Sequence, residues 1–133
     1  MTRTGRCLCD NVTYAIDGDF IAVGVCHCEQ CQRSGGSAFS VNALVQADQL
    51  KVSGPLATYE WRGVDGDAVY VRRRFCDKCG SNIASELVQA GIVAVKVGTL
   101  DDRSDIAPTI QVWCTDRQPW VSLPIELALD REG

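Results

Sequence analysis

Apolar and polar residues alternate along most of this chain, in short segments rich in β-branched and aromatic side chains. This alternation is typical of β-strands, because successive side chains of a strand point to opposite faces of a sheet. Strands are predicted at residues 12–16, 20–25, 37–45, 57–61, 68–75, 92–98, 109–114 and 123–129. Clusters of glycine, aspartate and other turn-forming residues separate them, and helix is limited to a single turn at residues 47–50. The pattern therefore predicts a mainly β fold, either a sandwich or a folded sheet.

Chain length and charge limit the number of domains and the kinds of partner that we expect for this protein. With 133 residues, the sequence is expected to form a single domain over residues 1–133, because two ordinary domains need a longer chain. A net charge of −4 at pH 7 argues against broad binding to nucleic acids or anionic membranes, so small molecules or proteins are the expected partners. No apolar segment resembles a secretion signal or a membrane span, and we expect a cytoplasmic protein. The sequence carries no signal for an oligomeric state.

The eight cysteines change this picture, because most of them are grouped. The clusters are Cys7 with Cys9, then Cys26, Cys28 and Cys31, then Cys76 with Cys79, whereas Cys114 stands alone. A reducing compartment disfavours disulfides, and clusters with this spacing favour zinc ligation over free thiols.

Two of the clusters predict a closed zinc site. The segment FCDKCGS at residues 75–81 has the Cys-x-x-Cys spacing of a zinc knuckle, and Gly80 supplies the conformational freedom that such a turn often needs. Cys7 and Cys9 are two residues apart, so an extended segment would place both on one face, where they can complete a tetrahedron. We therefore expect one zinc ion bound by Cys7, Cys9, Cys76 and Cys79.

The segment VCHCEQCQRSGG at residues 25–36 offers three further ligands, Cys26, Cys28 and Cys31. A zinc site with three protein ligands can keep an exchangeable fourth position. Two alternatives are open: this position receives a substrate, or Cys114 or a water closes it and both zinc ions are structural. His27 lies between two ligands, so an extended backbone would point its ring away from the metal, where it acts as a support or as a proton shuttle.

Cationic residues near the clusters also have two interpretations. A zinc site made of thiolates carries a net charge of about −1 or −2, so positive side chains are expected nearby. The candidates are Arg33, the run from Arg72 to Arg74, and Lys78. In a strand over residues 68–75, Arg72 and Arg74 share one face and Arg73 lies on the other. These side chains either form a solvated, charge-balancing face or bind the carboxylates of a substrate, in which case Arg33, Arg72 and Arg74 are the candidate binding residues.

The motifs GRCLCDNVTY, CHCEQCQRSGG, FCDKCGS and GTLDD follow one another in an order and at separations that resemble the glutathione-dependent formaldehyde-activating enzyme family, which includes relatives of centromere protein V. The resemblance covers nearly the whole chain. It implies a mainly β fold of twisted antiparallel sheets, similar to a small zinc-bearing accessory protein of Rab exchange, with two zinc ions per chain on the clusters described above. The chain departs from the family at Gln111, where members commonly carry a histidine. Glutamine can form hydrogen bonds but cannot titrate.

A site of three thiolates suits a thiol ligand. The thiolates donate charge to the metal, so we expect weak activation of water and ready binding of a fourth thiolate. Glutathione would then bind through its sulfur and attack formaldehyde to give S-(hydroxymethyl)glutathione, as the resemblance implies. This interpretation makes the chain a candidate carbon–sulfur lyase, and its candidate catalytic residues are Cys26, Cys28, Cys31 and His27. The alternative is a non-catalytic binding or scaffold module that zinc only stabilises.

Overall fold

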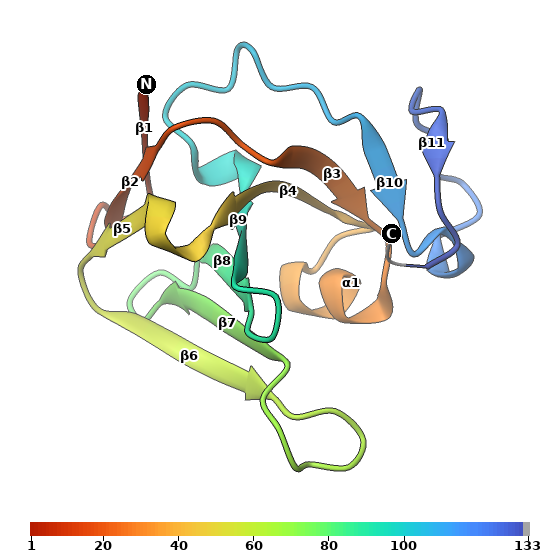
Figure 1. The fold of residues 1–133 in the computed structure, drawn as a ribbon, viewed down its shortest axis with the longest axis horizontal. Helices are drawn as coiled ribbons and strands as arrows, with labels where there is room; N and C mark the ends of the chain where they lie inside the picture. Colours follow the sequence, from red (N-terminus) through yellow and green to blue (C-terminus); the bar gives the residue numbers. More distant parts are fainter. Residues whose placement is uncertain (132–133) are drawn as a thin grey trace.

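The computed structural model describes residues 1–131, which form two β-sheets and one short α-helix (Figure 1). The smaller sheet has the order β1-β2-β5, and its strands are β1 (Thr2–Arg6), β2 (Thr13–Asp17) and β5 (Leu50–Ser53). The larger sheet has the order β11-β10-β3-β4-β9-β8-β7-β6. Its strands are β3 (Ala22–Cys26), β4 (Ser40–Gln46), β6 (Leu56–Trp61), β7 (Val71–Cys76), β8 (Asn82–Leu87), β9 (Ile92–Lys96), β10 (Ile110–Val112) and β11 (Leu127–Ala128).

The hydrophobic core lies where the two sheets face each other. Tyr14 and Ile16 of β2 pack in one cluster with Ala43 and Val45 of β4 and with Val95 of β9. The members of each strand are two residues apart because alternate residues share a face, which is the pattern that predicted these strands. Full burial of a large aliphatic side chain contributes about 1.5–3 kcal/mol. The core therefore fixes which face of the larger sheet is turned toward the smaller one.

The mainly β prediction is confirmed, but the strands are not all antiparallel. β10 runs parallel to both β3 and β11, whereas the other pairs are antiparallel. The strand predicted at residues 109–114 ends at Val112, because Trp113 has a φ of 55° and turns the chain into η3 (Cys114–Asp116). The strand predicted at residues 123–129 is reduced to β11, since Pro124 cannot donate a hydrogen bond to a neighbouring strand.

Helical structure is short. The turn predicted at residues 47–50 is confirmed as η1 (Ala47–Gln49), and η2 (Val97–Thr99) follows β9. The sequence did not predict α1 (Glu29–Gly35), which directly follows β3. Its N-cap is Cys28, and Gly36 ends it with a φ of 67°, a conformation that glycine adopts without strain. No helix within residues 1–131 is long and apolar enough to cross a membrane.

Candidate functional site

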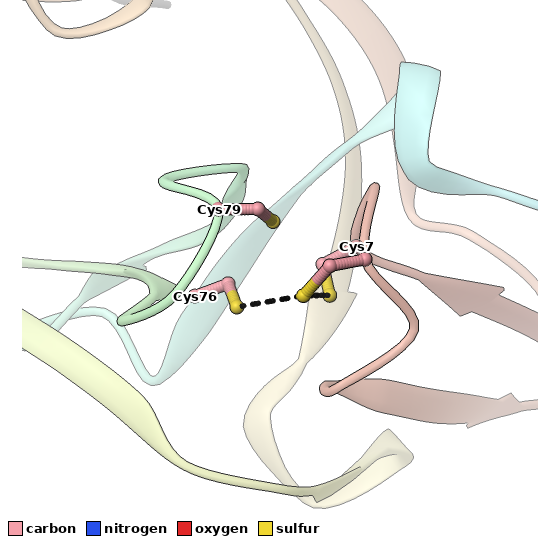
Figure 2. A group of neighbouring side chains, drawn as sticks. Cys7, Cys76 and Cys79 are labelled. Atoms are coloured by element: carbon pink, nitrogen blue, oxygen red, sulfur yellow. Dashed lines mark hydrogen bonds between the residues drawn. The ribbon is translucent and has the colours of Figure 1, made fainter.

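Four cysteine sulfurs meet where the smaller sheet approaches the turn between β7 and β8. Cys7 and Cys9 lie in the connection from β1 to β2, Cys76 ends β7, and Cys79 lies in the turn that follows. The four Sγ atoms all lie within 4.8 Å of one another. Figure 2 shows the side chains of Cys7, Cys76 and Cys79 pointing toward a common centre. This arrangement brings together residues that are far apart in the sequence.

The sulfur spacing fits a tetrahedral zinc ion. The Sγ atom of Cys9 lies 3.7 Å from that of Cys7 and 3.7 Å from that of Cys76. A Zn–S bond of about 2.3 Å in a regular tetrahedron separates the sulfurs by about 3.8 Å. Backbone N–H groups also face the sulfurs: Val12 donates to Cys7 at 3.2 Å and Lys78 donates to Cys76 at 3.4 Å. The four residues thus fit a closed zinc site with stabilised thiolates.

The backbone turns on both sides explain how these sulfurs converge. Gly80 has a φ of 77°, and its N–H donates to the carbonyl of Cys76 at 3.0 Å, which closes the zinc knuckle. Cys7 and Cys9 lie in a turn, so the predicted extended segment is wrong. Asp10, with a φ of 68°, completes that turn. The turn curls around the site and brings the two sulfurs together. An extended strand would only place both side chains on the same face.

The remaining clustered cysteines form a second group at the start of α1. Cys26 is the last residue of β3, Cys28 caps α1, and Cys31 lies in its first turn. Their Sγ atoms lie within 4.8 Å of one another, and all three residues are partly exposed. No fourth cysteine, histidine, aspartate or glutamate of residues 1–131 joins the group. The Sγ atom of Cys114 instead lies 3.8 Å from the carbonyl oxygen of Gln111.

His27 is held away from these sulfurs. The residue is fully buried, and its ring packs edge-on against Phe39 with the ring centres 5.7 Å apart. Its Nε2 atom lies 2.8 Å from Oε1 of Gln111, whose Nε2 atom donates to the carbonyl of Ile125 at 3.1 Å. Because Gln111 offers an acceptor to the ring, the hydrogen-bond network assigns the proton to Nε2 of His27. Gln111 therefore orients a buried ring.

The arginines proposed from the sequence have acidic partners within the chain. Arg33 pairs with Glu29 at 3.1 Å, and both side chains are exposed. It is two residues from Cys31, which on a helix is a rotation of about 200°, so it faces away from the sulfur. Arg72 pairs with Glu60 at 3.0 Å and with Glu86 at 2.8 Å.

Arg74 also reaches Glu86, at 3.6 Å. The prediction that Arg72 and Arg74 share a face of β7 is therefore confirmed. Because Ala84 and Glu86 are two residues apart on β8, and Ala84 is part of the core, this face is the one turned toward the core. Arg72 and Arg74 therefore lie on the opposite face of the larger sheet from Cys26.

Sequence reasoning missed three polar residues beside the second cysteine group. The register pairs Cys26 with Ser40 and Asn42 with Lys96, so these four residues share one face of the larger sheet. Nζ of Lys96 donates to Oδ1 of Asn42 at 2.7 Å, and Nδ2 of Asn42 donates to Oγ of Ser40 at 2.9 Å. Only the pairing of β3, β4 and β9 brings them together, so no local pattern could have identified them.

Cys31 is the sulfur at which these neighbours best stabilise negative charge. Hydrogen bonds from Cys26 and Cys28 are the main reason that the pKa of Cys31 is lowered, and Ser40 and Lys96 lower it further. Burial lowers the pKa of Lys96, while negative charge on Cys31 acts in the opposite direction. The positive charge of Lys96 therefore favours negative charge on this group of sulfurs.

A surface depression lies beside α1, away from the sulfurs. It has a volume of about 500 Å³ and is lined by the outer side of α1, including Glu29 and Arg33, and by Gln118. None of the cysteines lines it. The three-cysteine group is therefore not part of this depression.

Comparisons with known proteins agree with the arrangement of the cysteines. A family model of the glutathione-dependent formaldehyde-activating enzyme matches residues 2–116. The crystal structure of a Rhodobacter sphaeroides protein, a structural genomics target, is similar with a TM-score of 0.59 and 22% identity, over 79% of this chain and 91% of that chain. This likeness concerns the fold alone, and no curated protein matches the chain. Because the family model spans most of the sequence and all of the clustered cysteines, the chain belongs to the glutathione-dependent formaldehyde-activating enzyme family.

Proposed function

We propose that this protein binds glutathione or a related thiol at Cys26, Cys28 and Cys31 and acts as a carbon–sulfur lyase of the S-(hydroxymethyl)glutathione synthase type. The observation that carries the proposal is the group of three partly exposed sulfurs that no fourth ligand of residues 1–131 closes. Membership of the family supports glutathione as the thiol. The reaction belongs in the cytoplasm, where a reducing environment keeps such cysteines as thiols.

The two cysteine groups have different roles in this proposal. Cys7, Cys9, Cys76 and Cys79 hold a zinc ion that stabilises the fold, because four protein ligands leave no open position. A zinc ion bound to the three-cysteine group would supply a Lewis-acidic position at which a thiol is held as its thiolate. The residues around this group orient the thiol and stabilise negative charge on sulfur.

The chain's own residues favour addition of a thiol over hydrolysis. In the proposed reaction a carbon–sulfur bond forms, and the proton lost by the thiol ends on the oxygen of formaldehyde. Ser40 and Lys96 stabilise negative charge on Cys31, so they also stabilise it on a sulfur next to Cys31. His27 keeps its ring orientation through Gln111, and we assign it to the support of the loop that carries Cys26 and Cys28.

Calorimetry with two matched ligands tests the binding step. Glutathione should bind the zinc-loaded protein, whereas S-methylglutathione, which keeps both carboxylates but cannot provide a thiolate, should bind at least about tenfold more weakly. The affinity for glutathione should rise with pH toward the thiol pKa, because ligation releases a proton. Equal affinities would place the thiol site elsewhere. No binding of either ligand would favour the scaffold module.

A rate measurement tests catalysis separately. Glutathione and formaldehyde also combine without an enzyme, so adduct formation must exceed this background. We expect the acceleration to disappear in Cys28→Ser, provided that the variant still melts cooperatively. A folded Cys28→Ser protein with full acceleration would refute the proposed site.

A further inference from the structure

The face of the larger sheet that carries Cys26 also carries cations without acidic partners. Ala94 and Lys96 are two residues apart on β9, so they share this face. The register then pairs Ala94 with Ser85 and Ser85 with Arg73, which extends the face to β7. We call Ser40, Asn42, Ser85, Lys96 and Arg73 the polar face.

Lys96 and Arg73 differ from the three arginines that the sequence offered as carboxylate-binding residues. Within residues 1–131, neither forms an ion pair with an aspartate or glutamate, whereas Arg33, Arg72 and Arg74 all do. The hydrogen bond that Lys96 donates goes to the neutral amide of Asn42. Burial lowers the pKa of Lys96, and the charge of Arg73 on the same face lowers it further. The two cations thus share one face of the sheet, with β8 between their strands, and neither has a carboxylate partner within residues 1–131. A bound anion near them would lower the electrostatic free energy.

The sulfurs account for only part of this positive charge. Three thiolates with a zinc ion carry a net charge of about −1, which one ammonium group offsets. A second cation on the same face leaves an excess of positive charge in the ligand-free site, which suits a ligand that brings negative charge. Arg73 is well suited to this task, because a guanidinium group can donate two parallel hydrogen bonds to a carboxylate.

We propose that Lys96 and Arg73 form a carboxylate-binding position beside the three-cysteine site, so that this site selects thiols that carry a carboxylate. This inference rests on the proposed function, because it assumes that a thiol binds at Cys26, Cys28 and Cys31. Asn42 positions Lys96 through its hydrogen bond and Ser40 positions Asn42 in turn. Lys96 and Arg73 are specificity-determining residues in this arrangement, and Arg72 and Arg74, on the opposite face, have no part in it.

Mercaptopropionate and its methyl ester are suitable probes, because they share the thiol and the chain length and differ in one charge. We would measure the affinity of both for the zinc-loaded protein by calorimetry. The wild type should prefer the acid by about tenfold or more, as expected for a charge-assisted hydrogen bond. Arg73→Gln should bring the ratio of the two affinities closer to one, with the affinity for the ester unchanged. Lys96→Gln should also bring the ratio closer to one, but it should weaken the binding of both probes, because Lys96 also stabilises negative charge on sulfur. Arg72→Gln, next along β7 but on the other face, is the matched control and should keep the wild-type ratio.

The outcomes separate this inference from the proposed function. If neither probe binds the wild type, the proposed thiol site itself fails. If both bind with equal affinity, or if Arg73→Gln keeps the wild-type preference, the carboxylate position is refuted while the thiol site stands. Arg73→Gln decides the question if Lys96→Gln loses zinc or does not fold. A ratio that falls in Arg72→Gln as much as in Arg73→Gln would also overturn the assignment, because it would show a general effect of charge.

Discussion

Replacing Cys76 with serine should remove most of the free energy that holds the two sheets together. Cys76 is fully buried in the core, and its sulfur lies 3.7 Å from that of Cys9 on the other side of the site. Binding of a structural zinc ion contributes on the order of 10 kcal/mol. The whole free energy of unfolding of a domain is about 5–15 kcal/mol. Loss of this ion would therefore remove most or all of the free energy of unfolding. We expect Cys76→Ser to lose one zinc equivalent and its cooperative melting transition.

Cys28→Ser makes the same chemical change at the other site and serves as the control. Cys28 is partly exposed, and serine is a favoured N-cap, so α1 should keep its first turn. The variant should also lose one zinc equivalent but should still melt cooperatively. Zinc release into a chromophoric chelator and thermal unfolding followed by circular dichroism give both quantities. A larger loss of melting temperature in Cys28→Ser than in Cys76→Ser would show that the two sites are assigned the wrong way round.

Three further predictions concern residues outside the two sulfur groups. Burial raises the pKa of Tyr14 to about 12 from its usual 10, so the unfolded chain loses this proton first. The free energy of unfolding of the wild type should then fall between about pH 10 and pH 12 by up to about 1.4 kcal/mol per pH unit. Urea unfolding should show a flatter dependence on pH for Tyr14→Phe. The exposed control Tyr59→Phe should keep the wild-type dependence. Gln111→Leu removes the acceptor of the buried His27 N–H and should cost about 1–3 kcal/mol in urea unfolding. An unchanged free energy of unfolding would show that this hydrogen bond does not stabilise the fold. Cys114→Ala should leave the zinc stoichiometry unchanged, and loss of one zinc equivalent would identify Cys114 as a ligand.

Local spacing was enough to predict the cysteine groups, because short turns govern how neighbouring sulfurs converge. Cys76 and Cys79 form the predicted knuckle, and Cys26, Cys28 and Cys31 form a group of three where β3 passes into α1. The pairing of this knuckle with Cys7 and Cys9 was predicted because two ligands from each segment complete a tetrahedral site. The similarity to the Rab-exchange accessory fold and the roles of the individual site residues stay predictions.

The cations near the second site could not be chosen from the sequence, because strand register is set by contacts between distant segments. The alternation of β7 correctly divides Arg72 and Arg74 from Arg73, but it does not say which face meets the core. The pairing of β7 with β8, and of β9 with β8 and β4, determines which face of β7 meets the core. This register places Arg73 on the same face as Lys96. β1 was missed for a related reason: its Gly5 has few strand features, yet a Cβ atom there would lie 2.2 Å from the ring of Tyr14.

The sequence separation of the cysteines sets the order in which the two sites can form. Cys9 and Cys76 are 67 residues apart, and closing a loop of that length costs about 3.7 kcal/mol of chain entropy. The three-cysteine group lies within residues 26–31, so almost no chain has to be closed before its sulfurs meet. During synthesis this group leaves the ribosome first, whereas the four-cysteine group has to wait for Cys79 and for β7 and β8 to reach the N-terminal turn. If both groups bind zinc as proposed, a growing chain can therefore take up its first ion at the three-cysteine group, and the ion of the four-cysteine group binds last.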